Sequence, residues 1–587
     1  MAGCPQLDAP GRARTGKLIL ILGLRMGILA GLLAAAGARL HAQEFAPDAE
    51  RIAAAQRALD AGRWEEAAKL ASGPVNQSAD LDFLAGLALA RLGRWDDARD
   101  AFEAGHRKAP RDSRFLVESA GVAYKQKNFR AAKRALSEAL RLAPKDAYAR
   151  EFLGTLYFLE GNFEAALKYW NAVDKPRLRS VEVVPAPKLQ PRILTRAVGF
   201  NAPQILTRDA LLTTEARLEN LGIFPRERIE LAASSSGDYD TTLHLIERNR
   251  WGDSKLEGVI SLLGGLPYAT VYPEYYNIGR AAVNFTSLAR WDSEKRRFAA
   301  SLSAPLFHDP ALRLRVYFDA RNENWNLSET FFAPGEPLTD LNMRRVVGGV
   351  DLRSVVSGRW NWSTGFEVAN RSFRNLAGHT AASEQPFFTD STSVAYWLGA
   401  ERSLVRIPER RFTMDSSAEA LAGRDFADAV GSFATLRGSL RARWLPRAIG
   451  DDYEMQAQLR AGGTAGKVPL DELFQLGIER DNDLWLRGHA GTTGGRKGAA
   501  PLGRRYFLAN WEMDKNVYRN AFFTVKLGPF LDTGAVADSS GLFGSQRWLW
   551  DIGAQCKVRV LGSVTVVLSY GRDLRRGLDV FYGTTLR

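Results

Sequence analysis

Three short segments near the C-terminus decide how the chain is interpreted: LFQLG at residues 473–477, LRGH at 486–489 and GPFLD at 528–532. The third segment is an expected strand whose alternation places Asp532 on its polar face. Arg487 lies in a long polar loop between the first and third segments. A loop arginine and a strand carboxylate of this kind can meet only if the polar face lines an enclosure. An isolated Arg-Gly pair is more often a solvated loop, so this interpretation depends on the rest of the chain.

Period-two segments dominate the chain from about residue 258 onward. Apolar residues alternate with charged ones, and the segments at 312–320, 436–444 and 548–558 are the clearest. A soluble sandwich also alternates, but with shorter strands and a mixed polar face. Strands of about ten residues with one apolar and one charged face are typical of a transmembrane barrel, whose closure pairs every backbone amide. Residues 250–587 therefore predict an antiparallel β-barrel of about 16 strands, with Arg313, Arg315, Arg437 and Arg441 on its lumen face.

A helical repeat precedes the barrel. GRWEEA at 62–67 returns as GRWDDA at 93–98, KNFRAA at 127–132 and GNFEAA at 161–166. A period of about 34 residues with an aromatic after the turn is the tetratricopeptide signature. Residues 46–176 are therefore expected to form an all-α solenoid whose concave face suits an extended peptide or helix. A purely structural role for the repeats is the alternative.

Residues 178–248 predict a small α+β domain. Thr207 is placed to cap a helix that runs to Leu221 and stops at Gly222. Segments 228–233 and 241–247 alternate as two strands joined by a Ser-Gly-Asp turn. Only one helix is evident, because four prolines interrupt residues 185–203.

The composition of the chain limits its function. It has 587 residues and a formal net charge of +13, and residues 1–42 contribute to that charge as an expected signal peptide. No continuous basic stripe follows, so a nucleic-acid partner is not expected. The six histidines show no ligand spacing, no catalytic constellation is evident, and the Gly-rich segment 461–468 lacks the features of a phosphate loop. The sequence thus predicts no metal, no cofactor and no enzymatic activity.

The C-terminal pattern resembles the BamA/TamA family of outer-membrane assembly barrels, also called the bacterial surface antigen family. In that family an Arg-Gly-aromatic loop motif folds into the lumen, where its arginine pairs with an aspartate of a later strand. The matching residues are Leu486, Arg487, Gly488 and His489 in the loop, with Asp532 and Glu512 as the implied partners. His489 departs from the pattern because the family has an aromatic there. The 178–248 segment similarly resembles one polypeptide-transport-associated (POTRA) domain, which can add a client strand to its open sheet edge.

The resemblance implies a barrel in the cell outer membrane, surrounded by lipid, with its N-terminal domains in the periplasm. Its function would be to translocate or insert polypeptides, with the repeats docking a client or a periplasmic protein partner. A polysaccharide or small-solute export pore with a tetratricopeptide scaffold is the alternative, and a receptor or structural barrel is a third. The sequence leaves homo-oligomerisation, client identity and lumen opening undecided.

Overall fold

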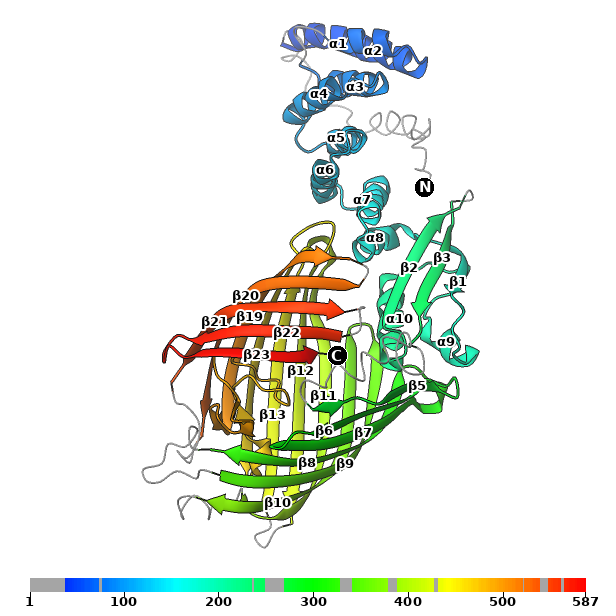
Figure 1. Ribbon diagram of the computed structural model, residues 1–587. Coiled ribbons are helices and arrows are strands. Elements are labelled where there is room, and N and C mark those ends of the chain that lie inside the picture. The colour runs from blue at the N-terminus through cyan, green and yellow to red at the C-terminus, as the bar shows by residue number, and fades with distance from the viewer. Residues whose placement is uncertain are drawn as a thin grey trace, which may run out of the picture. The chain divides into compact units, whose positions relative to one another are not determined.

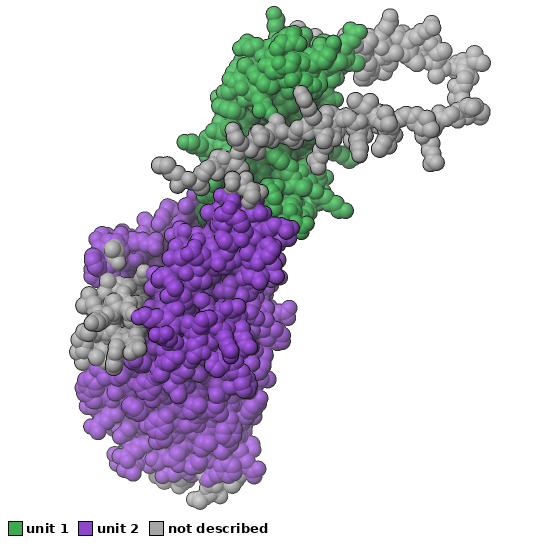
Figure 2. Space-filling view, turned by 90° about the vertical axis from the view of Figure 1, so that its right-hand side faces the viewer, with its two compact units in different colours: residues 1–175 green, residues 176–587 purple. Residues whose placement is uncertain are grey.

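The computed structural model describes residues 37–72, 77–234, 237–248, 269–327, 340–377, 388–426, 431–520, 522–538, 547–560 and 564–586. The predicted signal peptide lies mostly outside these residues, as does the start of the predicted barrel. The chain divides into two compact units, residues 1–175 and 176–587 (Figure 2).

The first unit is a stack of antiparallel helix pairs (Figure 1). Its helices are α1 (Gly37–Asp60), α2 (Trp64–Ala71), α3 (Ala79–Arg91), α4 (Trp95–Lys108), α5 (Ser113–Lys125), α6 (Phe129–Leu142), α7 (Ala147–Leu159) and α8 (Phe163–Trp170). The turns within the pairs place Gly62, Gly93 and Gly161 at φ of 73°, 75° and 76°. The third pair has Lys127 at the same position, at φ 59°. Each turn therefore uses a left-handed residue, which glycine adopts without a steric cost.

Small residues allow the paired helices to pack closely, as the repeat pattern predicts. Ala98, Ala132 and Ala166 are fully buried. A Cβ atom on Gly86 would lie 2.4 Å from the ring of Phe102, and one on Gly154 would lie 2.4 Å from Trp170. Glycine at these positions thus makes room for an aromatic side chain from the next helix.

The second unit begins with a three-stranded sheet and two helices. Strand β1 (Leu178–Val184) pairs in parallel with β3 (Tyr239–Ile246), and β3 pairs in antiparallel with β2 (Arg226–Ala233), which gives the order β1-β3-β2. Helix α10 (Arg208–Leu221) begins and ends as predicted: Thr207 Oγ1 accepts from the Ala210 amide, and Gly222 is left-handed at φ 69°. The sequence makes only one helix evident, and the structure adds a second, α9 (Pro191–Ala197), which begins at Pro191. Proline is favourable at a helix start because its missing N–H is not needed there.

The rest of the unit is a large antiparallel sheet whose strand order is that of a closed barrel (Figure 1). Short strands β4 (Thr270–Val271) and β5 (Glu274–Ile278) come first. The long strands are β6 (Val283–Trp291), β7 (Lys295–Pro305), β8 (Leu312–Asn326), β9 (Asp340–Ser357), β10 (Trp360–Ala377), β11 (Ser391–Ile407), β12 (Phe412–Asp425), β13 (Gly431–Trp444), β14 (Tyr453–Gly466), β19 (Arg505–Arg519), β20 (Phe523–Ala537), β21 (Leu549–Val560), β22 (Val564–Asp573) and β23 (Asp579–Leu586). The predicted fold class, a helical repeat followed by a small α+β domain and an antiparallel barrel, is confirmed.

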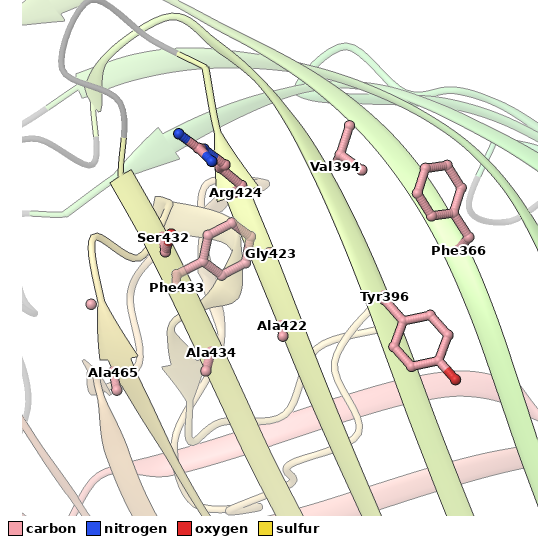
Figure 3. A pocket seen from close by; sticks show the side chains of 11 residues that line it. Phe366, Val394, Tyr396, Ala422, Gly423, Arg424, Ser432, Phe433, Ala434 and Ala465 are labelled. Atoms are coloured by element: carbon pink, nitrogen blue, oxygen red, sulfur yellow. The ribbon is translucent and has the colours of Figure 1, made fainter.

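The two faces of this sheet differ in chemistry. Large apolar side chains are exposed on the outer face, among them Phe366, Val368, Tyr396, Leu398, Leu436, Leu527 and Ile552. A shallow hollow on this face forms where Ala422, Ala434 and Ala465 lie beside the larger Phe366 and Tyr396 (Figure 3). The inner face carries the charged residues described below. Among the described helices, none is long and apolar enough to cross a membrane.

Candidate functional site

Residues 467–504 connect β14 to β19 and contact the inner face of the barrel. The loop contains short strands β15 (Phe474–Gln475), β16 (Thr492–Thr493), β17 (Arg496–Lys497) and β18 (Leu502–Gly503). Its apolar residues Phe474, Leu476, Leu484 and Leu486 form one buried cluster with inner-face residues Tyr506, Leu508, Val536 and Leu549. The hydrophobic effect thus holds the loop against β19, β20 and β21. We call this segment the lumen loop.

Arg487 of the lumen loop pairs with Asp532 of β20. Its Nη2 lies 2.7 Å from Asp532 Oδ1, and its Nε and backbone amide donate to Oδ2 at 2.8 and 3.1 Å. The side chains are 4% and 0% exposed. Two side-chain bonds to one carboxylate are the bidentate geometry that makes arginine pairs strong. The guanidinium also lies 3.8 Å above the ring centroid of Phe530, where a cation is attracted to the ring face.

A network of charged side chains extends from this pair. Arg487 Nη1 donates to Glu512 at 3.0 Å and to Gln555 at 2.9 Å. Lys557 bridges Glu512 and Asp514 at 2.6 and 2.7 Å. The structure therefore brings together Arg487, Asp532 and Glu512, the three residues that the sequence pairs. Gln555, Asp514 and Lys557 are additional members that the sequence reasoning missed.

The tip of the lumen loop lies directly against the barrel wall. A Cβ atom on Gly488 would lie 2.6 Å from the Asp551 carboxyl carbon, and one on Gly571 would lie 2.2 Å from the Arg487 carbonyl oxygen. The Gly488 amide donates to Asp551. His489 follows, with Nδ1 3.2 Å from the Asp551 carboxylate and Nε2 3.4 Å from that of Asp573. Both glycines are needed because the two backbones leave no room for a side chain.

A second ionic anchor lies at the start of the lumen loop. Arg371 of β10 is 1% exposed and its Nε donates to Asp471 at 2.6 Å. Arg345 of β9 contacts the same carboxylate at 2.7 Å. Glu472 lies 3.6 Å from Arg371. Arg345 and Arg371 thus bind the adjacent loop carboxylates Asp471 and Glu472. Their strands, β9 and β10, are far from β20, the strand of Asp532, in the closed strand order.

A third anchor involves the first strands of the barrel. Asp481 accepts from Arg290 of β6 at 2.5 Å and from Arg297 of β7 at 2.7 Å. Glu479 pairs with Lys295 at 3.0 Å. Because its anchors lie on β6, β7, β9, β10 and β19–β22, the lumen loop spans the interior of the barrel.

Arg480 connects the two ends of the sheet. Its guanidinium donates to Tyr272 at 2.7 Å, next to β4, and lies within hydrogen-bond distance of Thr270 in β4 and Thr585 in β23. In strand order β23 is followed by β4. The lumen loop therefore contacts both sides of the junction between the first and last strands.

The four arginines predicted for the lumen face have different surroundings. Arg313 donates to the Asn220 carbonyl at 2.8 Å and to Ser303 at 2.6 Å, so it connects α10 to the barrel. Arg315 pairs with Asp351 at 2.6 Å. Arg437 lies 3.9 Å from Glu472 and 5.3 Å from the Phe474 ring, both in the lumen loop. Arg441 is exposed.

The anchors on β6, β7, β9 and β10 escaped the sequence reasoning. Their partners are separated by 100 or more positions, for example Arg371 and Asp471 or Arg290 and Asp481. The sequence does show the two partners separately. The loop has four carboxylates, at positions 471, 472, 479 and 481, and the strands have arginines on their polar face. Sequence alone does not say which arginine meets which carboxylate.

The helical repeats match a known family model. A tetratricopeptide repeat model matches residues 83–130 and 117–176. No curated protein matches the chain. The structure of BamA from Haemophilus ducreyi lacking POTRA domains 1–3 aligns with 70% of this chain and 84% of that chain, at 13% identity and a TM-score of 0.41. CdiB from Escherichia coli aligns with 70% of this chain and 75% of that chain, at 13% identity and a TM-score of 0.43. CdiB from Acinetobacter baumannii aligns with 70% of this chain and 73% of that chain, at 14% identity and a TM-score of 0.41.

Proposed function

We propose that this chain is an outer-membrane barrel that translocates or inserts polypeptides, and that its helical repeats dock a client or a periplasmic partner. The proposal assigns the chain no catalytic activity. The observation that carries it is the lumen loop, which spans the barrel and is held by the buried pair Arg487–Asp532.

A lumen loop held in this way favours gated transport of a large cargo over a permanent small-solute pore. A solute pore needs a continuous polar path, whereas anchors on several parts of the wall cross the lumen. Cargo can pass only after the loop or the wall rearranges. Arg480, which contacts both sides of the β23–β4 junction, links the position of the loop to that junction.

The small domain supplies a surface suited to an extended peptide. Strand β2 is at the edge of its sheet, while β3 is central, so the edge predicted between 228 and 247 belongs to β2 alone. An edge strand offers main-chain donors and acceptors to an added strand. Asn220 donates to the Pro310 carbonyl at 2.9 Å, and Asn284 donates to the Leu221 carbonyl at 2.8 Å, so the domain is tied to the barrel wall. A strand bound at β2 would therefore be held near the barrel.

The outer face of the sheet supports a membrane location. Its exposed aromatic and aliphatic side chains would be costly in water, at about 25 cal/mol per Å² of apolar surface, and are stable against lipid.

Two adjacent proline substitutions test the edge. Along a strand, backbone N–H groups point alternately toward and away from the neighbouring strand. Of Glu230→Pro and Leu231→Pro, one removes a ladder bond to β3 and the other removes only an outward N–H. We expect both variants to lower the amounts of client proteins in the outer membrane or the medium. The outward variant should do so with the small domain still folded, as judged by its protease resistance.

The alternative function predicts a different pattern. In a polysaccharide pore, replacing Arg437 and Arg441 by Gln would reduce exported polysaccharide, while the proline variants would change nothing. Arg313 is left out of this test because its loss would also release α10. Unchanged protein levels in both proline variants, together with reduced polysaccharide in the arginine variant, would reject the polypeptide proposal.

A further inference from the structure

Three potential metal ligands converge where the lumen loop meets the barrel wall. His489 comes from the loop, Asp551 from β21 and Asp573 from the end of β22. One ring nitrogen and one oxygen from each carboxylate lie within 4.8 Å of one another, and all three residues are buried. Their positions are far apart in sequence, which is why no ligand spacing was visible there.

The potential ligand atoms have unused bonding capacity. Nε2 of His489, Oδ1 of Asp551 and Oδ2 of Asp573 are buried and form no hydrogen bond with other described residues. His489 and Asp573 are 3.4 Å apart at Nε2 and Oδ2, but the contact lacks hydrogen-bond geometry. A buried polar atom without a partner costs about 1–3 kcal/mol, so three such atoms in one place call for an additional partner.

The charge balance around the cluster identifies the sign of that partner. Arg487 and Lys557 already face three carboxylates of the adjoining network, those of Asp532, Glu512 and Asp514. Arg460 reaches Asp532 only through Asn510. Asp551 and Asp573 add two further negative charges, with side chains 0% and 1% exposed. Buried charges persist when they are paired or coordinate a metal. The cluster therefore favours a cation.

We propose that His489, Asp551 and Asp573 bind a divalent transition-metal ion of the Zn²⁺ class. One imidazole and two carboxylates are ligands that Zn²⁺ accepts in tetrahedral sites, with a water at the fourth position. Ligands about 2.0–2.2 Å from Zn²⁺ are about 3.3–3.6 Å apart in a tetrahedron. The ligand atoms now lie within 4.8 Å of one another, so their separations must shorten by up to about 1.5 Å when one ion binds all three.

The ion would fasten the tip of the lumen loop to two strands at once. Arg487 holds the loop to β20, and His489 through the ion would hold it to β21 and β22. The Gly488 amide, which donates to Asp551, orients that carboxylate toward the histidine. Groups that orient ligands in this way commonly raise metal affinity. The site is a structural clasp, and it adds to the proposed transport function without depending on it.

Metal content of the full-length protein tests the proposal. The wild type, purified in detergent, is equilibrated with Zn²⁺, passed through metal-free buffer and measured by mass spectrometry of the metal. We expect about one ion per chain in a three-ligand site. His489→Phe and Asp573→Asn should each lower the affinity by at least the roughly 10–100-fold that loss of an outer-shell partner costs. His244→Gln is the matched control, because His244 is an exposed histidine that pairs with Glu230.

A second readout separates metal loss from misfolding. Tetrahedral Co²⁺ bound to the wild type should give visible ligand-field bands that Zn²⁺ displaces. Chelation should speed proteolysis within residues 467–504 in the wild type and leave the rate in His489→Phe unchanged. Heat-modifiable gel migration verifies that each variant is folded.

Two results would overturn the proposal. One is a wild type without stoichiometric metal and without a Co²⁺ spectrum, which would mean that a protonated His489 bridges the two carboxylates unaided. The other is unchanged metal content in both folded variants.

Discussion

Arg99 in α4 and Arg487 in the lumen loop each contact two carboxylates, but their surroundings differ. Arg99 pairs with Asp96 at 2.9 Å and Asp100 at 3.2 Å, and the three side chains are 44%, 74% and 69% exposed. Arg487 pairs with Asp532 and Glu512 at similar distances with 4% of its side chain exposed. Water screens the first set, so it contributes little. The second set has lost its water and depends on its partners.

The helical unit and the lumen loop are stabilised by different kinds of interaction. The helical unit is stabilised by apolar packing, with Phe102 and Phe115 fully buried between helices. Many of its ion pairs are exposed, as at Arg99, although Lys133 and Glu160 form a largely buried pair. The lumen loop combines one apolar cluster with ion pairs to β6, β10 and β20 of the barrel wall. Loss of a buried apolar residue leaves a cavity, whereas loss of one ion partner leaves a buried charge without compensation.

The largest expected effect is that of Arg487→Ala. It leaves Asp532 buried without its cation, and breaking a buried pair on one side costs about 3–5 kcal/mol. We expect faster protease cleavage within residues 467–504 in isolated outer membranes. Arg496→Ala in the same loop is the control, because Arg496 is 41% exposed and its pairs with Glu294 and Asp340 are screened. Equal protection of the loop in both variants would mean that the buried pair does not hold it.

In the helical unit, the corresponding large effect should come from an apolar residue. Phe102→Ala removes a fully buried ring that packs against Gly86 and should cost about 3–5 kcal/mol. Arg99→Ala in the same helix should change the free energy of unfolding far less, because water screens its ion pairs. Urea unfolding of the full chain, followed by its helical circular dichroism, measures both variants. Comparable losses would show that surface charge matters as much as packing in this unit.

Sequence reasoning succeeded where the signal is local or periodic. The repeat placed the helix pairs, alternation placed the strands, and Thr207 and Gly222 marked the ends of α10. It missed α9, because Pro191 was interpreted as a loop signal when it begins a helix.

The candidate site was predictable only in part, for a physical reason. Arg487, Asp532 and Glu512 followed from a family motif. The anchors at Asp471 and Asp481 depend on which distant strands the loop reaches, and alternation along a strand does not contain that information. His489 was noted only as a departure from the motif, because Asp551 and Asp573 come from two other strands.

A third prediction concerns a carboxylate that has no cation. Burial, together with nearby Glu215 and Glu219, raises the pKa of Glu227 in β2 to about 8. Because its pKa is higher in the folded state, its contribution to stability is complete below the usual glutamate pKa of about 4.3. That contribution is lost as the pH rises through about 8. Glu227→Gln should therefore slow hydrogen exchange in β2 and β3 relative to wild type at pH values near and above 8.

The control for this prediction is Glu182→Gln in β1, where the carboxylate is exposed. Both variants are compared with wild type at the same pH, so that intrinsic exchange rates cancel. The same small change in both variants, or an effect of Glu227→Gln that is larger at pH 5 than at pH 9, would contradict the assignment.

The smallest expected effect tests backbone strain in the helical unit. Lys127 occupies the turn position that glycine holds in the other three pairs, at φ 59°. The left-handed conformation costs a non-glycine residue about 1–2 kcal/mol, which a glycine would avoid. The greater freedom of glycine in the unfolded chain offsets about 0.4–1 kcal/mol of that stabilisation. Lys127→Gly should thus stabilise the unit by about 0.5–1 kcal/mol in urea unfolding. Lys125→Gly, two residues earlier in the last turn of α5, should instead destabilise it by up to about 1 kcal/mol. If both changes destabilised the unit, contacts of the Lys127 side chain would outweigh its backbone strain.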